Sequence, residues 1–590
     1  MIFSPRYRGK RTARNRTAWW TGIGLGASAL AVALLGCTAS PSDLPPITSL
    51  DTVETHSPYG VVATGFAGAT EAGVLMLEDG GNAIDAAITA AFAATVSAPG
   101  SSGLFGTTYI VLHLADGRNI AIDGTARVPL RTSKDELAEL QAADRLHGIK
   151  VAAVPGTLAA LDHTLARYGT KSLAEAMAPA IALAEQGFLV TSSKKAAINK
   201  YVDTIRDDEY LSRLILKEGQ DAPDLGTRIK QQDLARTMRR LSTAGADDFY
   251  RGAIAYLIAA DMEKRGGFVS RGDLGLYRVT EQQPLRGTYR GTEVISFPWP
   301  GAGGAVIEAL NVLEHYPSEF LAETSANQLQ AYAEAFHIAI SDHARFTSWS
   351  GVSGRPPDTT YTSKPFAAER AALINFDHAL SSEALGQESR FYTPPGGTTQ
   401  VSVADRFGNV VSLTQTMGRF FGARAMAPGL GIVYNSFLEG YDLNHPSALT
   451  PRTACPSDMS PTIVLQEGRL VIALGSSGSK RIPGFVAQVI SNVVDHRLGV
   501  RDAVLAPRTV WDSENEPGIL IEVFPPNTSE DVKTLEDRGY RIVHRVEYPA
   551  TRRDFINCGA VNAVIFDPAR RSFAGAGDPR RQGTALAARR

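Results

Sequence analysis

Residues 394–416 read PPGGTTQVSVADRFGNVVSLTQT, the most informative segment of the chain. Two alternating runs flank the turn 405–409, which predicts a β-hairpin with Gly408 in the left-handed position that a three-residue loop requires. If Asp405 faces Asn409, the pairing runs outward residue by residue, so Thr398 lies directly opposite Thr416 within side-chain reach. The two glycines before Thr398 let the backbone bend sharply there.

A hydroxyl on the first residue of this strand suits a self-cleaving nucleophile. The Thr398 hydroxyl is placed to attack the Gly397 carbonyl, and hydrolysis of the resulting ester leaves Thr398 as a new N-terminus. Its α-amine, with a pKa of roughly 7.7–8.0 against about 10.4 for a lysine, can take the proton from its own hydroxyl, so no histidine is needed. On spacing alone, an ordinary threonine-rich hairpin is the favoured explanation of the pattern.

A second segment, ALGSSGSKRI at residues 473–482, supports the catalytic interpretation. We expect a strand that ends at Leu474, a loop of small residues and then a helix. Exposed backbone N–H groups in such a loop can form an oxyanion hole. A phosphate-like anion nest or a plain turn are the alternatives.

Composition excludes several function classes. The chain has 590 residues, enough for two to four domains or one large intertwined one. The formal charge of −2 argues against a nucleic-acid partner. The three cysteines are far apart, which predicts no metal site, and we expect Cys455 and Cys558 to be buried thiols rather than a disulfide. No metal or organic cofactor is expected, since the loop PWPGAGG at 298–304 is not a dinucleotide fingerprint.

The N-terminus has the parts of an export signal. Six basic residues precede an apolar run from about residue 18 to 36, which ends in Leu-Leu-Gly before Cys37. This order resembles a bacterial lipoprotein signal, in which the cysteine receives the lipid; an uncut membrane anchor is the alternative. We therefore expect an exported protein, periplasmic or on the cell surface and held to the membrane.

The rest of the chain predicts layered α/β structure. Residues 58–397 begin with strands and Ala-rich helices and continue mostly helical, whereas residues 398–590 are rich in short strands separated by one long helix. The predicted organisation is a signal (1–36), a linker rich in Pro, Ser and Thr (37–57), and two fragments that meet at Gly397 and Thr398.

Together these segments resemble gamma-glutamyltransferases over nearly the whole mature chain. GGTTQVSVADRFGNVVSLTQT resembles the start of that family's small subunit, PSDMSPTIV its substrate loop and GSSGSKRI its oxyanion loop. GGNAIDAAI, VPGTLAAL, DLGLYRV, PWPGAGG and AGAGDPRRQGTA resemble further landmarks in the right order. The resemblance implies a four-layer αββα N-terminal nucleophile hydrolase whose two fragments form a heterodimer.

The resemblance also assigns roles to individual residues. Thr398 is the nucleophile, Thr416 hydrogen-bonds it, and Gly478 and Ser479 supply the oxyanion-hole N–H groups. Ser457 matches the first of two substrate-binding serines, and Glu439 takes the place of the Asp that holds the substrate α-amino group.

The departures from the family pattern concern the substrate. Thr125 stands where the family has its carboxylate-binding Arg, and Arg127 is the candidate to replace it. Asp458 stands in place of the second serine, Gln400 in place of a histidine, and Gly418 in place of an asparagine. Two carboxylates, Glu439 and Asp458, without a fixed guanidinium weaken the case for an α-carboxylate substrate.

We therefore expect an amidohydrolase or acyltransferase that works through an acyl-Thr intermediate on a small amide or peptide. Gamma-glutamyl amides such as glutathione, with hydrolysis and transpeptidation, are the first expectation. An acylase for another acyl group, like the cephalosporin acylases, is the alternative, and an inactive binding lipoprotein is the non-enzymatic one.

Overall fold

The structure is a computed structural model that describes residues 54–590 except 144, 324, 349–357, 387–395, 446–447, 513–517, 524–526 and 548–557. The predicted signal, Cys37 and most of the linker lie outside the described residues. The predicted linker boundary is wrong by three residues, because strand β1 (Thr55–Ser57) already belongs to a sheet. Its backbone pairs with the late strand β20 (Ser572–Ala576), so the folded part begins no later than Thr55.

Two seven-stranded sheets form the centre of the described chain. The first contains both arms of the predicted hairpin, in the order β21 (Thr584–Ala587), β2 (Gly60–Thr64), β10 (Thr398–Asp405), β11 (Val410–Thr416), β3 (Thr107–His113), β4 (Asn119–Gly124) and β7 (Thr280–Gln282). The second has the order β1, β20, β19 (Ala560–Asp567), β15 (Arg469–Ser477), β14 (Thr462–Gln466), β9 (Thr292–Ser296) and β8 (Leu285–Tyr289). Each pairing within them is antiparallel, and each sheet combines strands from both sides of residue 398.

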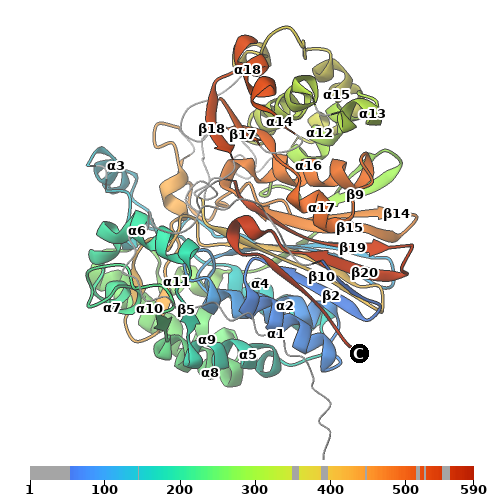
Figure 1. Ribbon diagram of the computed structural model, residues 1–590. Coiled ribbons are helices and arrows are strands. Elements are labelled where there is room, and N and C mark those ends of the chain that lie inside the picture. The colour runs from blue at the N-terminus through green and yellow to red at the C-terminus, as the bar shows by residue number, and fades with distance from the viewer. Residues whose placement is uncertain are drawn as a thin grey trace, which may run out of the picture. The chain divides into compact units, whose positions relative to one another are not determined.

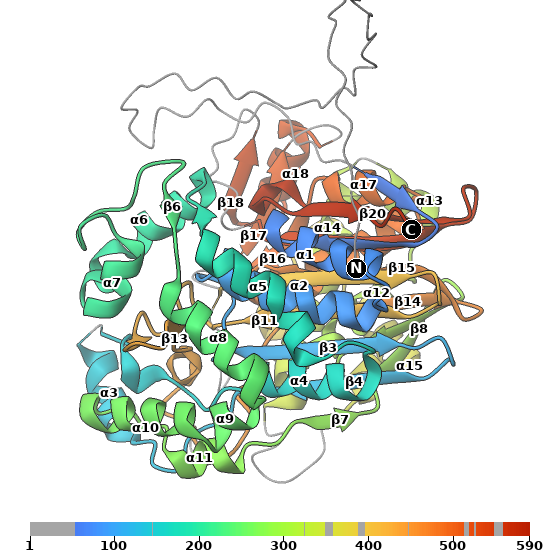
Figure 2. The same cartoon turned by 90° about the horizontal axis from the view of Figure 1, so that it is seen from below.

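Helices cover the outer faces of both sheets, which confirms the four-layer αββα prediction (Figure 1). On the first sheet lie α1 (Ala67–Glu78), α2 (Ala83–Ser97) and α4 (Thr157–Tyr168); α5 (Leu173–Gln186) packs on α2, and α8 (Gln232–Ala244) packs on α5 (Figure 2). On the second lie α12 (Gly303–Leu313), α16 (Ile482–Val494) and α17 (Val500–Leu505), and α14 (Ala326–Thr347) packs on α12. Helix α2 is Ala-rich and buried along its whole length, as its apolar sequence predicts.

The other elements lie around this centre. They include α3 (Lys134–Ala142), α6 (Ser192–Arg206), α7 (Glu209–Ile215), α9 (Asp247–Tyr250), α10 (Ala253–Arg265), α11 (Arg271–Leu276), α13 (Ser318–Ala322), α15 (Lys364–Ala371) and α18 (Ser529–Asp537). Three small sheets pair β5 (Phe188–Leu189) with β6 (Arg228–Ile229), β12 (Met426–Ala427) with β13 (Ile432–Val433), and β16 (Thr509–Asp512) with β17 (Gly518–Val523) and β18 (Ile542–Glu547).

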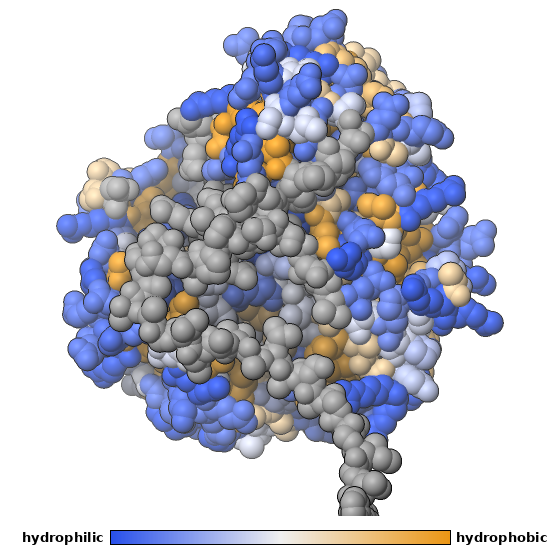
Figure 3. Space-filling view, in the orientation of Figure 1, coloured by the Kyte–Doolittle hydropathy of each residue, from blue (hydrophilic) through white to orange (hydrophobic). Residues whose placement is uncertain are grey.

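Hydrophilic side chains cover most of the described surface on the face shown in Figure 3, and hydrophobic ones form separate patches. Within the described part of the chain, every helix is too short or too polar to cross a membrane. Cys455 and Cys558 are both buried and free, which confirms the prediction of two buried thiols. Burial raises the pKa of the Cys455 thiol to about 12, so it stays protonated and unreactive.

Asp405 fixes the turn of the central hairpin. Its carboxylate accepts hydrogen bonds from the backbone N–H groups of Phe407 and Asn409, both at 2.9 Å, and Gly408 has the predicted positive φ of 96°. The same carboxylate accepts a bond of 2.7 Å from the N–H of Ala83, at the start of α2, where negative charge is favourable. One buried carboxylate thus sets the hairpin register and holds the hairpin against the helix layer.

Candidate functional site

Thr398 is the first residue of β10, and its Cα pairs with that of Thr416 on β11. This confirms the register predicted from the turn seven residues away. Thr398 is 5% exposed and Thr416 is 2% exposed, so both hydroxyls lie at the edge of the protein interior. Within the described residues, the Thr398 hydroxyl makes no hydrogen bond and lines a cleft.

The Thr416 hydroxyl holds the peptide unit that precedes Thr398. It donates a hydrogen bond to the Gly397 carbonyl and accepts one of 3.0 Å from the N–H of Gly418. Gly397 packs closely on the loop after β11, since a Cβ there would lie 2.6 Å from the Gly418 oxygen and 2.8 Å from the Phe420 nitrogen. Only glycine fits at this position without moving backbone.

Polar side chains align the two sheets behind Thr398. Gln400 is fully buried, and its amide group bonds to Ser402, Ser412 and Thr414. The Ser412 hydroxyl donates to the Leu474 carbonyl on β15, and Gly475 leaves the space that the Gln400 side chain fills. The hairpin thus contacts β15 first at Leu474 and then, nearer to Thr398, at Gly475. The end of β15 therefore lies opposite Thr398, and Ser477 lines the same cleft.

The predicted oxyanion loop follows directly. Strand β15 continues to Ser477, so the prediction that it ends at Leu474 is wrong by three residues. Gly478 and Ser479 both have positive φ, 141° and 57°, and lead into a 3-10 turn (Ser479–Arg481) and then α16. Their N–H groups have no hydrogen-bond partner in the described part of the chain, as expected at a helix start. The buried Ser479 hydroxyl likewise has none.

The candidate substrate residues do not line the cleft beside Thr398. The segment 126–128 bonds to the segment 453–455 through backbone groups, and the N–H of Ser457, two residues later, donates to the Pro300 carbonyl at 3.0 Å. The Thr125 side chain is fully buried and donates to Asp123. The Arg127 guanidinium is ion-paired with Asp123 at 2.9 Å, so it already has a carboxylate partner.

Glu439 also has a partner that the sequence did not predict. Arg419, in the loop after β11, forms an ion pair of 2.5 Å with it. Burial raises the pKa of the Glu439 carboxyl, and the Arg419 charge opposes that rise. The expectation of carboxylates without a fixed guanidinium is therefore wrong for Glu439, because the loop folds back and brings Arg419 to it.

The cleft beside Thr398 was not predicted. It encloses about 850 Å³ of empty space, part of it open to solvent. None of the candidate substrate residues lines it, nor do Gly478 and Ser479. Its walls come from segments that are far apart in the sequence, namely 65–66, 98–101, 188, 193–198, 215, 420–421 and 580–582.

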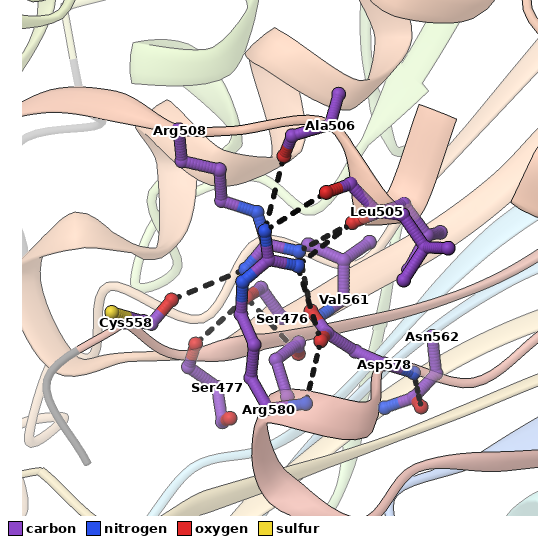
Figure 4. A network of polar contacts seen from close by, with 12 residues as sticks. Ser476, Ser477, Leu505, Ala506, Arg508, Cys558, Val561, Asn562, Asp578 and Arg580 are labelled. Atoms are coloured by element: carbon purple, nitrogen blue, oxygen red, sulfur yellow. Dashed lines mark hydrogen bonds and ion pairs between the residues drawn. The ribbon is translucent and has the colours of Figure 1, made fainter. Parts of the chain in front are cut away.

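A buried ionic network holds the 580–582 side of this cleft (Figure 4). Arg508 and Arg580, each at most 2% exposed, both pair with Asp578, and Arg580 also pairs with Glu522 at 2.6 Å. Asp578 accepts a bond of 3.0 Å from the N–H of Val561. The network thereby ties the conspicuous C-terminal segment AGAGDPRRQGTA to β19 and to the wall of the cleft.

The comparisons with known proteins agree with this geometry. Residues 69–588 match the family model described as gamma-glutamyltranspeptidase. The chain belongs to this family. It is similar to an acylase, the ACY 1 proenzyme of Pseudomonas sp. strain SE83, at 35% identity over 86% of this chain and 90% of the relative. It is also similar to the glutathione hydrolase proenzyme of Escherichia coli K12, at 30% identity over 82% and 86%.

Among solved structures, the cephalosporin acylase of Bacillus halodurans matches with a TM-score of 0.79 and 26% identity, over 94% of this chain and 99% of that one. The chain is therefore an enzyme of the N-terminal nucleophile hydrolase fold, a hydrolase or transferase with similarity to acylases and glutathione hydrolases alike. Family membership alone does not select between these two substrate classes.

Proposed function

We propose that this enzyme is a self-processing amidohydrolase that cleaves itself between Gly397 and Thr398 and then uses Thr398 as its nucleophile. The observation that carries the proposal is the contact between the Thr416 hydroxyl and the carbonyl of Gly397. A hydrogen-bond donor on this oxygen draws electron density from the carbonyl carbon and stabilises the negative charge that develops when the neighbouring hydroxyl attacks.

Self-cleavage then proceeds in two balanced steps. The Thr398 hydroxyl oxygen attacks the Gly397 carbonyl carbon, the C–N bond breaks, and the hydroxyl proton passes to the released amine. Water hydrolyses the resulting ester, which leaves a carboxylate on Gly397 and restores the Thr398 hydroxyl. The fragments, about 37–397 and 398–590, remain a heterodimer because each central sheet contains strands of both.

Catalysis repeats the same chemistry on a substrate. The α-amine of Thr398, with a pKa of roughly 7.7–8.0, accepts the proton of its own hydroxyl as the oxygen attacks the amide. The N–H groups of Gly478 and Ser479 stabilise the oxyanion, and the departing amine takes the proton. Water then releases the acyl group from Thr398, and an acceptor amine in place of water would give transfer.

Of the two alternatives for the acyl group of the substrate, the contacts support an acyl group other than gamma-glutamyl, as in an acylase. A gamma-glutamyl group carries an α-carboxylate that needs a cation, but Arg127 is ion-paired with Asp123 and Arg419 with Glu439. Ser457, Asp458 and Thr125 offer no positive charge in their place. We propose an acyl group other than gamma-glutamyl, and weak cleavage of gamma-glutamyl-p-nitroanilide.

N-terminal sequencing tests the processing step. The purified precursor should convert to two fragments without added protease, and the smaller should begin Thr-Thr-Gln-Val. The variant Thr398→Ala should remain one chain and be inactive. A fragment that begins at Thr399 or elsewhere would move the nucleophile and refute the assignment.

Location outside the cytoplasm, with a lipid on Cys37, is also part of the proposal. Its support is the order of basic residues, apolar run and Leu-Leu-Gly-Cys at 34–37. Mass spectrometry of the N-terminal peptide should find acyl chains on Cys37. An N-terminus that is uncut and unmodified would favour the membrane-anchor alternative.

A further inference from the structure

The loop that carries the N–H groups of Gly478 and Ser479 has a backbone that needs support from outside. Both residues have positive φ, 141° and 57°, and Ser479 is not a glycine. A non-glycine residue in this region is unfavourable and keeps its conformation only where the surrounding structure holds it. Within the turn, the N–H of Arg481 donates to the Gly478 carbonyl at 3.3 Å, which is long for such a bond.

The Phe485 ring supports the loop on one side. A Cβ added at Gly478 would lie 2.9 Å from this ring, so the loop packs directly on it. The Arg508 guanidinium lies 5.1 Å from the centre of the ring and helps to hold it in place. This packing limits the movement of Gly478, but it does not fix Ser479, whose hydroxyl has no hydrogen bond within the described chain.

Arg481 connects the turn to a point outside the loop. It is the last residue of the 3-10 turn, and its guanidinium pairs with the Asp512 carboxylate at 2.6 Å. The two side chains are only 3% and 2% exposed, so water screens their attraction little. His544 on β18 contacts the same carboxylate oxygen at 3.3 Å. Movement of Arg481 would separate a buried pair and leave each charge uncompensated, which is costly.

The small sheet of β16, β17 and β18 keeps Asp512 in a fixed position. Asp512 is the last residue of β16, and Trp511 before it stacks on His337 of α14 with ring centres 3.8 Å apart. At the start of β16, the N–H of Thr509 donates to the Gln488 side chain of α16 at 3.2 Å. The strand that carries Asp512 is therefore attached to two helices, and through Arg481 it is attached to the loop.

We propose that Arg481 is a positioning residue for the reaction, and that its pair with Asp512 keeps the N–H groups of Gly478 and Ser479 aimed at the oxyanion. The inference rests on the proposed function, since it takes these two N–H groups as the oxyanion donors. Arg481 acts through the loop and takes no part in bond breaking. The small sheet, which lies outside the two central sheets, thereby acquires a role in catalysis.

The main test replaces both partners, Arg481→Met together with Asp512→Leu. Removal of both charges leaves neither of them buried and unpaired, so the protein should fold and melt near the wild-type temperature. It should also process itself at the wild-type rate, because the Thr416 hydroxyl contacts the Gly397 carbonyl in the precursor. Its kcat should fall by about tenfold to a hundredfold with KM nearly unchanged, because the oxyanion forms only in the transition state and a displaced donor no longer reaches it.

Turnover is measured with gamma-glutamyl-p-nitroanilide, octanoyl-p-nitroanilide and p-nitrophenyl acetate, and the probe that wild type cleaves best is used for the variants. The matched control is Arg370→Met together with Asp342→Leu, a buried pair on α15 and α14 whose side chains are 13% and 0% exposed. Its removal should leave kcat unchanged. Asp512→Asn keeps the shape of the side chain and an oxygen acceptor, so it should fold readily and lower kcat by a smaller factor, again without a change in KM.

A folded double variant or an Asp512→Asn enzyme with the wild-type kcat overturns this inference and leaves the proposed function standing. Equal slowing of processing and turnover also overturns it, because that result indicates general damage to the fold. The same holds for an equal loss of kcat in the Arg370 control. A processed wild-type enzyme that cleaves none of the three probes overturns the proposed function and this inference with it.

Discussion

Replacing Thr416 by Val removes one hydroxyl and keeps the shape of a buried, β-branched strand residue. The hydroxyl has three contacts: a bond donated to the Gly397 carbonyl, one accepted from the N–H of Gly418 at 3.0 Å, and a longer one of 3.4 Å to the Gly418 carbonyl. Loss of the first removes a donor from the oxygen that becomes negative during self-cleavage. Loss of the second leaves the Gly418 N–H without its partner.

The two losses have different expected magnitudes. Removing one donor from an oxyanion costs about 2.7–4 kcal/mol of transition-state stabilisation, so the rate of self-cleavage should fall by about a hundredfold to a thousandfold. The unpaired N–H should lower the free energy of unfolding by about 1–3 kcal/mol. Thr416→Ser restores a hydroxyl and should recover most of the rate.

The assay is a time course of precursor made in a cell-free system and separated on denaturing gels, with thermal melting to measure stability. Thr414→Val is the matched control, because Thr414 lies two residues away on the same strand and its hydroxyl donates to Gln400 at 2.6 Å instead of to the scissile carbonyl. A folded Thr416→Val protein that processes at the wild-type rate would refute the reasoning. So would equal slowing in Thr414→Val.

Three further predictions rest on particular contacts. Gly397→Ala should process at least tenfold more slowly, about 1.4 kcal/mol or more in barrier, because its Cβ would meet the backbone of Gly418 and Phe420, and the gel time course measures it. Asp405→Ala should lower the free energy of unfolding by about 2–4 kcal/mol, measured by urea denaturation, since it leaves the N–H groups of Phe407, Asn409 and Ala83 without their acceptor. Arg127→Ala should leave the ratio of gamma-glutamyl to alkanoyl anilide cleavage nearly unchanged, because Arg127 is held by Asp123; a selective loss of gamma-glutamyl cleavage would show that it binds that substrate.

Local signals in the sequence predict the centre of the site well. The turn at Asp405–Asn409 sets the pairing of Thr398 with Thr416, because a hairpin register follows from its turn. The small residues at 475–479 likewise predict the bend into α16. The end of β15 was placed too early, since Ser476 and Ser477 pair with β19, a partner about eighty residues later in the sequence that no local pattern reveals.

The cleft and the ion pairs depend on tertiary packing, which local sequence signals do not predict. Phe66, Lys194, Phe420 and Arg581 come from four distant segments, and only the folded chain brings them to one wall. Arg419 lies twenty residues before Glu439, in a loop whose path no periodic pattern predicts. The sequence thus indicates the reaction more readily than the acyl group, because the nucleophile lies on one hairpin and the candidate substrate residues do not.

The central claim is that Thr398 carries the acyl group during turnover. Processed enzyme should be mixed with a slowly released acyl anilide, quenched in acid within the first turnover and digested for mass spectrometry. The account predicts that the acyl mass appears on the N-terminal peptide that begins Thr-Thr-Gln-Val, on residue 398, and that it disappears as product forms. An acyl group on another residue, or steady turnover with none on Thr398, would contradict the account.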